Sequence, residues 1–218
     1  IYYCRDFVNE PVNFMNAERL ASEFKRIGEE VGIKTEILNQ AKIESLKMGG
    51  LLSVNKGSVD PATFTIMEWN PENKVNKQPI ILIGKGIVFD TGGMNLKPDD
   101  YMNDMKDDMA GAATMACAIY SVAKNKVPVH VIALLPATDN RPGGNAFVSG
   151  DVITMYDGTT FEVVSTDAEG RLIMADALSY AKKFNPELMI DAATLPGADQ
   201  REMGKYGIVA MHNEAENY

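Results

Sequence analysis

Residues 79–93 read PIILIGKGIVFDTGG, and this stretch decides the fold class. Its first part, residues 79–84, is apolar throughout, which is typical of a strand covered on both faces. Further apolar strands are expected at residues 129–135 and 188–193, and an alanine-rich helix at 109–123. Strands that alternate with helices in this way predict an α/β fold, with a mixed, largely parallel β-sheet sandwiched between helices.

The remaining elements are expected around this sheet. Asn16 has the side chain of an N-cap, and the apolar residues after it repeat at helical spacing up to about Val31. A helix at residues 41–47 should end at Gly49-Gly50, since glycine commonly follows the last turn of a helix. Further strands are expected at residues 35–38, 63–69 and 160–164, and a further helix at 171–184.

Two stretches, residues 85–108 and 136–151, carry few helix or strand signals and are expected to be irregular. Long irregular segments inside a compact domain are uncommon and usually functional. The ligand site of such a sheet lies beyond the carboxyl ends of its strands, so the segments after Ile83, Val164 and Ala193 should converge there. The first irregular stretch carries aspartates at positions 90, 99, 100, 104, 107 and 108.

Composition limits the possible partners. The formal net charge is −9 over 218 residues, and such a surface repels phosphates and anionic lipids, so neither nucleic acid nor a membrane is expected as a partner. With 45% hydrophobic residues the chain can bury a proper core, and it has no apolar run long enough to cross a bilayer. These features predict a soluble globular protein.

The cysteines indicate a reducing compartment. Cys4 and Cys117 are the two cysteines of the chain, and neither has the spacing of a zinc or redox motif. No signal peptide is visible, so a cytoplasmic location is expected. The chain starts with Ile1 rather than methionine, which suggests a piece of a longer protein.

Three charged residues, Asp167, Glu169 and Arg171, alternate between an expected strand and an expected helix. In extended backbone, residues two apart point the same way, so two carboxylates and a guanidinium would face one place. The alternative is that Asp167 and Glu169 cap the following helix and complement its dipole. Taken alone, the pattern favours neither interpretation.

Other charged residues lie in the first irregular stretch. Lys85 and Asp90 follow the apolar strand, and Gly84-Lys85-Gly86 suggests a phosphate loop, but the GxxxxGK[ST] pattern is absent. Taken alone, Lys85 is therefore expected to be an exposed lysine in a tight turn. Asp107-Asp108 precedes the alanine-rich helix and alone favours helix capping. Lys97 alone is an ordinary loop lysine.

Together these residues favour a metal site. Four carboxylates at one end of a sheet repel one another unless cations neutralise them. Oxygen-rich sites suit Mg²⁺ or Mn²⁺, and Zn²⁺ also accepts carboxylates. His130 and His212 are the two histidines, and neither has an HExxH setting, so a histidine zinc site is not expected. The absence of GxSxG argues against a Ser-His-Asp hydrolase.

Several blocks of the chain resemble one known family. Residues 165–172 read STDAEGRL and are similar to the leucyl aminopeptidase signature NTDAEGRL, with serine at the first position. Residues 84–98 resemble the metal loop of the same family. Its other blocks are matched, in the expected order and spacing, by residues 105–109 with 111–113, by residues 191–195 with 197–198, and by residues 7–11. The chain therefore resembles, over nearly its whole length, the leucyl aminopeptidase or cytosol aminopeptidase family (peptidase family M17).

The resemblance implies a zinc-peptidase-like catalytic domain over residues 1–218 that removes an N-terminal leucine or other apolar residue from peptides with a free N-terminus. It implies two divalent cations, Mn²⁺ or Zn²⁺ with Mg²⁺ as a further option. Their implied ligands are Lys85, Asp90, Asp108, Asp167 and Glu169. Lys97 would stabilise the oxyanion, and Arg171 would hold a bicarbonate ion that shuttles the proton. The implied substrate-lining residues are Met105, Thr194, Leu195 and Gly197.

The resemblance also implies features beyond this chain. The family has an N-terminal domain and a further C-terminal part of the catalytic domain, and we expect both to be missing here. Family members assemble as hexamers, and we expect the intact protein to do so. Ala110 replaces a usual glycine, and Pro196 replaces a usual threonine. Because proline lacks an N–H and restricts Leu195, the resemblance does not determine the substrate preference there.

Two alternatives stay open. Another two-metal hydrolase, such as a phosphoesterase, would also need clustered carboxylates, although Lys85 as a ligand and the lack of metal-binding histidines favour the peptidase. A metal-binding fragment of the same fold without activity is the second alternative.

Overall fold

A mixed β-sheet forms the centre of the molecule in the computed structural model, which describes residues 1–195, 203–204 and 207–213. Its order is β1-β2-β5-β3-β8, and β4 pairs with β5 beyond the end of β3. The strands are β1 Lys34–Leu38, β2 Thr63–Trp69, β3 Ile80–Gly84, β4 Gly86–Asp90, β5 Val131–Asn140 and β8 Leu188–Ala192.

The pairing directions confirm the predicted fold class. β3 pairs in parallel with β5 and β8, and β4 pairs in parallel with β5. β2 is antiparallel to both β5 and β1. The carboxyl ends of β3, β4, β5 and β8 therefore lie on the same side of the sheet, where the ligand site of such folds is found.

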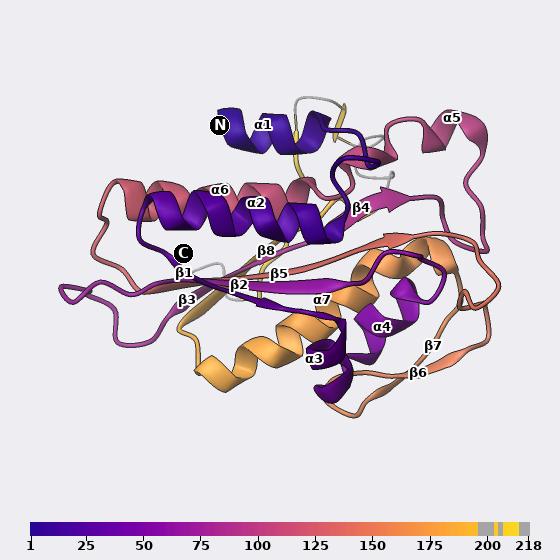
Figure 1. The fold of residues 1–218 in the computed structure, drawn as a ribbon. Helices are drawn as coiled ribbons and strands as arrows, with labels where there is room; N and C mark the ends of the chain where they lie inside the picture. Colours follow the sequence, from indigo (N-terminus) through magenta and orange to yellow (C-terminus); the bar gives the residue numbers. More distant parts are fainter. Residues whose placement is uncertain (196–202, 205–206, 214–218) are drawn as a thin grey trace.

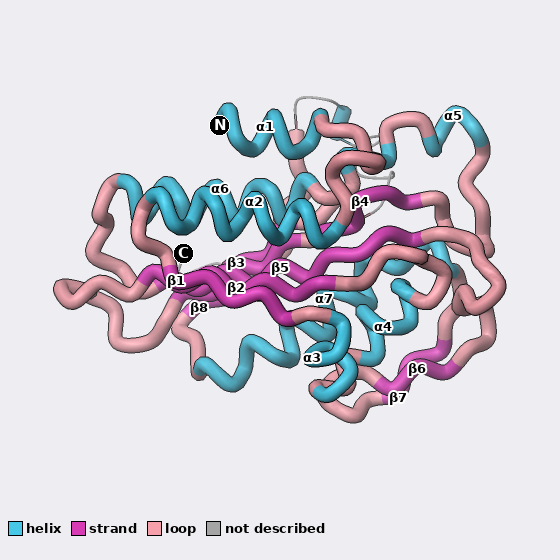
Figure 2. The backbone as a smooth tube through the Cα atoms, in the orientation of Figure 1, coloured by secondary structure: helices cyan, strands magenta, loops and turns pink. Residues whose placement is uncertain are grey.

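Helices cover both faces of the sheet (Figures 1 and 2). One face carries α1 Tyr2–Asn9, α2 Ala17–Glu30 and α6 Ala110–Lys124. The other carries α3 Gln40–Ser45, α4 Gly49–Asn55 and α7 Glu169–Ala181. Each layer buries its own apolar cluster against the sheet. Within the described ranges, none of the helices combines the length and the apolar character that a bilayer crossing requires.

The beginning of α2 was predicted correctly. Asn16 Oδ1 accepts a hydrogen bond from the backbone N–H of Arg19 at 3.0 Å, as an N-cap does. Leu20, Phe24 and Ile27 follow at helical spacing and are fully buried against the sheet.

The prediction that Gly49-Gly50 ends a helix is wrong, because α4 begins there. A Cβ atom on Gly50 would lie 2.4 Å from Leu172 O, so the glycine permits close packing of α4 on α7. The buried carboxylate of Asp176 on α7 accepts a hydrogen bond from the Leu51 N–H at 3.0 Å. An acceptor from another helix therefore starts α4, and no local sequence signal reveals it.

The two stretches predicted to be irregular are partly regular. β4 lies inside residues 85–108, and β5 runs on to Asn140, past its predicted end at residue 135. β4 pairs with this last part of β5, from Ala137 to Asn140, so pairing between the two segments completes both strands. Helix α1 and strand β6 Val152–Thr154 were not predicted. β7 Thr160–Glu162, which pairs with β6, confirms the strand predicted at residues 160–164 but ends before residue 164. The remaining short helices are α5 Asp99–Met102, η1 Met105–Asp107, η2 Thr166–Ala168 and η3 Lys182–Phe184.

Two glycines bring the start of α6 onto the strand ends. A Cβ atom on Gly84 would lie 2.5 Å from Ala112 Cα, and one on Gly111 would lie 2.2 Å from Ala192 O. In this space Ala112 N donates to Lys85 O at 2.8 Å, and Lys85 N donates to Ala192 O at 3.1 Å. The contact therefore sets Lys85, at the end of β3, beside the residues that precede α6.

We expect Gly84→Ala to lower the free energy of unfolding by about 1–3 kcal/mol, because the added methyl group meets backbone atoms that cannot move independently. Urea denaturation measures this change. Gly144→Ala is the matched control, since a Cβ atom there meets nothing within 4 Å. Equal stabilities of the two variants would show that the close approach is not required.

Candidate metal centre

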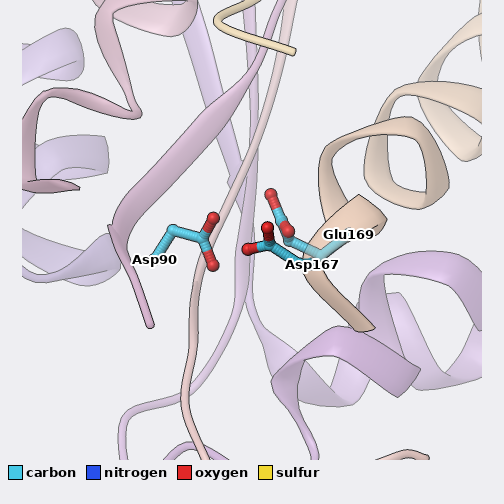
Figure 3. Close-up of side chains that lie close together, drawn as sticks. All are labelled: Asp90, Asp167 and Glu169. Atoms are coloured by element: carbon cyan, nitrogen blue, oxygen red, sulfur yellow. The ribbon is translucent and has the colours of Figure 1, made fainter. Parts of the chain in front are cut away.

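Three carboxylates meet at the carboxyl end of the parallel strands (Figure 3). Asp90 ends β4, Asp167 lies in η2, and Glu169 is the first residue of α7. One oxygen from each lies within 4.8 Å of the others. Asp90 and Glu169 are buried, whereas Asp167 is exposed. Such an arrangement brings together like charges from segments far apart in the sequence.

Lys85 links this group to a fourth carboxylate. Its Nζ lies 2.7 Å from Asp108 Oδ1 and 3.1 Å from Glu169 Oε1, and it donates to Thr194 O at 2.9 Å. The Lys85 side chain is 2% exposed. A Cβ atom on Gly170 would lie 2.5 Å from Lys85 Cε, so the glycine after Glu169 leaves the space that the lysine occupies.

Lys97 joins the other two carboxylates from the loop after β4. Its Nζ lies 2.9 Å from Asp90 Oδ2 and 2.6 Å from Asp167 Oδ1. Four carboxylates thus surround two ammonium groups. The structure brings together all five residues predicted as metal ligands, together with Lys97.

The electrostatics of this cluster are dominated by burial. Burial raises the pKa of Asp108 to about 7, although the neighbouring Lys85 opposes the shift. Burial also raises the pKa of Glu169 and of Asp167. For Lys85, burial lowers the pKa, but the carboxylates of Asp108 and Glu169 outweigh it, so the pKa lies above its ordinary value. The four carboxylates therefore carry more negative charge than Lys85 and Lys97 neutralise.

The donor set fits divalent cations. Asp108 Oδ2 is buried and has no hydrogen-bond partner among the described residues, so one oxygen of the cluster keeps its lone pairs free. The other donors are carboxylate oxygens and one lysine nitrogen, which suit Mn²⁺, Mg²⁺ or Zn²⁺.

The comparison with known families agrees with this geometry. Residues 2–218 match the model of the cytosol aminopeptidase family (M17), catalytic domain. The chain belongs to this family.

Relatives of the cytosol aminopeptidase family resemble the chain in both sequence and fold. A probable cytosol aminopeptidase of Chloroherpeton thalassium is 54% identical over 195 residues, which are 89% of this chain and 38% of that protein. The leucyl aminopeptidase structure from Trypanosoma cruzi superposes with a TM-score of 0.88 at 32% identity, covering 92% of this chain and 40% of that one. For the leucine aminopeptidase of Caenorhabditis elegans the TM-score is 0.86 at 32% identity, covering 91% and 40%. The chain spans about two fifths of the length of these relatives.

The family signature at residues 165–172 is folded differently from the expectation. Its residues form η2 and the start of α7 rather than extended backbone. Asp167 and Glu169 still converge, but Arg171 is rotated from Glu169 by about 200° around the helix axis and is exposed. No hydrogen bond or ion pair joins Arg171 to the carboxylates within the described part of the chain. The prediction that Asp167, Glu169 and Arg171 lie on one side of an extended segment is therefore wrong.

Ser165 keeps a capping role where the family signature has asparagine. Its Oγ accepts a hydrogen bond from the Asp167 N–H at 3.2 Å, at the start of η2. Serine and asparagine both accept such bonds from the backbone two residues on. The substitution therefore preserves the local turn that carries Asp167.

The predicted substrate-lining residues lie around the same centre only in part. Thr194 Oγ1 donates to Asp108 Oδ1 at 2.6 Å, and its carbonyl accepts from Lys85. Met105 is half-buried at the start of η1, and Leu195 is 42% exposed. Gly197 and Pro196 lie outside the described residues.

Neither histidine takes part in the cluster. His130 Nε2 lies 2.9 Å from Glu68 Oε1, so it is a partner of a strand residue. His212 is exposed.

Sequence reasoning missed the residues that hold the two loops together. Thr166 Oγ1 donates to Gly92 O at 2.6 Å and accepts from the Asn95 N–H at 2.8 Å. Asn95 Oδ1 in turn accepts from Thr166 N at 2.7 Å. Gly92 (φ +85°) and Gly93 (φ +66°) turn the loop in the left-handed region that favours glycine. The family signature and the metal loop are therefore bound to each other directly.

Asn140 was also missed. Its Nδ2 lies 2.8 Å from Asp90 Oδ1, 3.0 Å from Thr166 O and 3.3 Å from Glu169 Oε2. A polar pair, Asp139-Asn140, a few residues after an apolar strand was the available signal. It was overlooked because the strand was predicted to end at residue 135.

We expect Thr166→Val to lower the free energy of unfolding by about 1–3 kcal/mol, because it keeps the shape but removes the buried hydroxyl that donates to Gly92 O and accepts from the Asn95 N–H. Thr166→Ser is the matched control, since it keeps the hydroxyl. Urea denaturation compares the three proteins. A serine variant as unstable as the valine variant would mean that the methyl group matters and the hydroxyl does not.

Proposed function

We propose that the protein is a two-metal aminopeptidase that hydrolyses the N-terminal residue, leucine or another apolar one, from peptides. The observation that carries this proposal is the cluster of four carboxylates that face Lys85 and Lys97. Membership of the cytosol aminopeptidase family supports the same reaction. The names of the relatives support a cytoplasmic location.

The residues that would hold two cations are Lys85, Asp90, Asp108, Asp167 and Glu169. Asp90 and Glu169, which are both buried, would each contribute to holding both cations. Lys85 would coordinate only after losing its proton, since an ammonium nitrogen has no free lone pair. When bound, divalent cations lower the pKa of water and polarise the carbonyl group that it attacks.

Lys97 would act as a fixed positive charge next to the scissile carbonyl. Burial lowers its pKa, but hydrogen bonds from its ammonium group to Asp167 and Asp90 raise it above its ordinary value. Lys97 therefore stays protonated at neutral pH. An ammonium group held in a half-buried site stabilises an oxyanion more strongly in the transition state than in the substrate.

The remaining parts of the proposal concern the wider site. Arg171 would hold a bicarbonate ion at the first turn of α7, where its exposed guanidinium is free to bind an anion. Met105, Thr194, Leu195 and Gly197 would line the pocket of the N-terminal side chain. Mn²⁺ or Zn²⁺ is proposed as the native pair of ions, and the intact protein is proposed to form a hexamer without nucleic acid or membrane partners.

A pair of assays tests the reaction class. With Mn²⁺ present, we expect turnover of a leucine chromogenic amide and none of a phosphate monoester. A chelator should abolish the amide turnover, and Mn²⁺ should restore it. Turnover of the phosphate ester alone would establish the phosphoesterase alternative, and Mn²⁺ binding without any turnover would indicate an inactive metal-binding fold.

We expect Lys97→Gln to lower kcat about 10²- to 10³-fold with little change in KM, because the lost charge acts on the transition state. Steady-state kinetics at saturating Mn²⁺ measure both constants. Lys124→Gln, on an exposed lysine at the end of α6, is the control and should behave as the wild type. A rise in KM at constant kcat would place Lys97 in substrate binding instead.

A further inference from the structure

Asn140 lies where the sheet and the metal-ligand loops meet. It is the last residue of β5, fully buried, and the β4–β5 pairing sets it opposite Asp90. Its backbone carbonyl accepts hydrogen bonds from Thr91 N at 3.0 Å and Thr91 Oγ1 at 2.9 Å. Its main chain therefore anchors the loop directly after Asp90.

The side chain of Asn140 also reaches the segment from Thr166 to Glu169, on the other side of the site. An amide nitrogen has two hydrogens, and the two shortest contacts of Nδ2 are to Asp90 Oδ1 and to Thr166 O, with Glu169 Oε2 next. Asp90 lies at the end of β4, whereas Thr166 and Glu169 lie in the segment that runs from η2 into α7. One neutral group thus connects two segments whose carboxylates repel each other.

The surroundings fix which end of the amide faces the carboxylates. The Oδ1 atom is buried without a hydrogen-bond partner in the described structure, and a Cβ atom on Gly93 would lie 2.7 Å from it. Turning the amide over would set an oxygen against three other oxygens. The glycine at 93 therefore leaves room for Asn140 Oδ1, and the donor end points into the cluster.

We propose that Asn140 is a positioning residue that holds Asp90 against the Thr166–Glu169 segment, so that the metal-binding carboxylates are arranged before the cations bind. The inference rests on the proposed two-metal site. A neutral donor suits this position because it hydrogen-bonds to Asp90 and to the Thr166–Glu169 segment without taking the place of a cation. Groups that orient metal ligands in this way affect metal affinity by about 10- to 100-fold.

The test compares Asn140→Leu, which keeps the approximate shape without donors, with Asn140→Ala. Thr138→Val is the matched control, because Thr138 is fully buried on the same strand and its hydroxyl hydrogen-bonds to Asn55, away from the carboxylates. Calorimetric titration of the full chain with Mn²⁺ gives the dissociation constants. Urea denaturation without metal gives the stability of each variant.

We expect both Asn140 variants to bind Mn²⁺ about 10- to 100-fold more weakly than the wild type, with Thr138→Val unchanged in affinity. A purely structural role would instead lower the stability of all three variants and leave Mn²⁺ affinity intact, which would overturn the proposal. Failure of both Asn140 variants to fold would also overturn it. If the wild type itself binds no Mn²⁺, the proposed function fails as well, so the two failures are distinguishable.

Discussion

Repulsion among buried carboxylates is the constraint on which the rest of the structure depends. Asp90, Asp108 and Glu169 are withdrawn from water at one edge of the sheet, where their charges interact strongly. Lys85 and Lys97 offset part of this charge through short ion pairs. Buried negative charge in excess of positive charge destabilises a fold, and rigid neighbours that hold the groups in place, protonation of a carboxylate or bound cations each reduce that cost.

The sheet supplies that rigidity because β5 pairs with different strands along its length. β5 pairs first with β3 and then with β4, so one long strand aligns the two segments on either side of Lys85. Gly84 and Gly111 let α6 approach these strand ends, which fixes Asp108. Asp167 and Glu169 lie just before and at the start of α7. The hydrogen bonds between Thr166 and Asn95 join this segment to the loop that follows Asp90. The carboxylates thus depend on contacts across the whole width of the domain.

The local sequence pattern predicted those elements of this arrangement that are determined by interactions between residues close together in the chain. The apolar run at residues 79–84 and the N-cap Asn16 are determined by neighbours in the sequence, and both were predicted. β4 was not, because it begins with Gly86, lies shortly before Gly92-Gly93, and is completed as a strand by pairing with β5. The gathering of the four carboxylates at one end of the sheet was predicted from the expected strand ends. The assignment of Lys85 and Lys97 to the same site came from the family resemblance, since no spacing rule links a lysine at 85 to an aspartate at 108.

Asn140 shows why the polar residues that support a site are harder to predict than the charged residues in it. A carboxylate cluster is visible in a sequence because charge is costly to bury and so demands an explanation. A buried asparagine is neutral, and its importance depends on register: one residue earlier or later on β5 it would face the opposite side of the sheet. Its donors meet Asp90 and Glu169 only because β4, β5 and α7 are already aligned. The site therefore depends on the fold. Neutral groups at the strand ends, such as Asn140, hold the metal-binding carboxylates in positions that the register of the sheet determines.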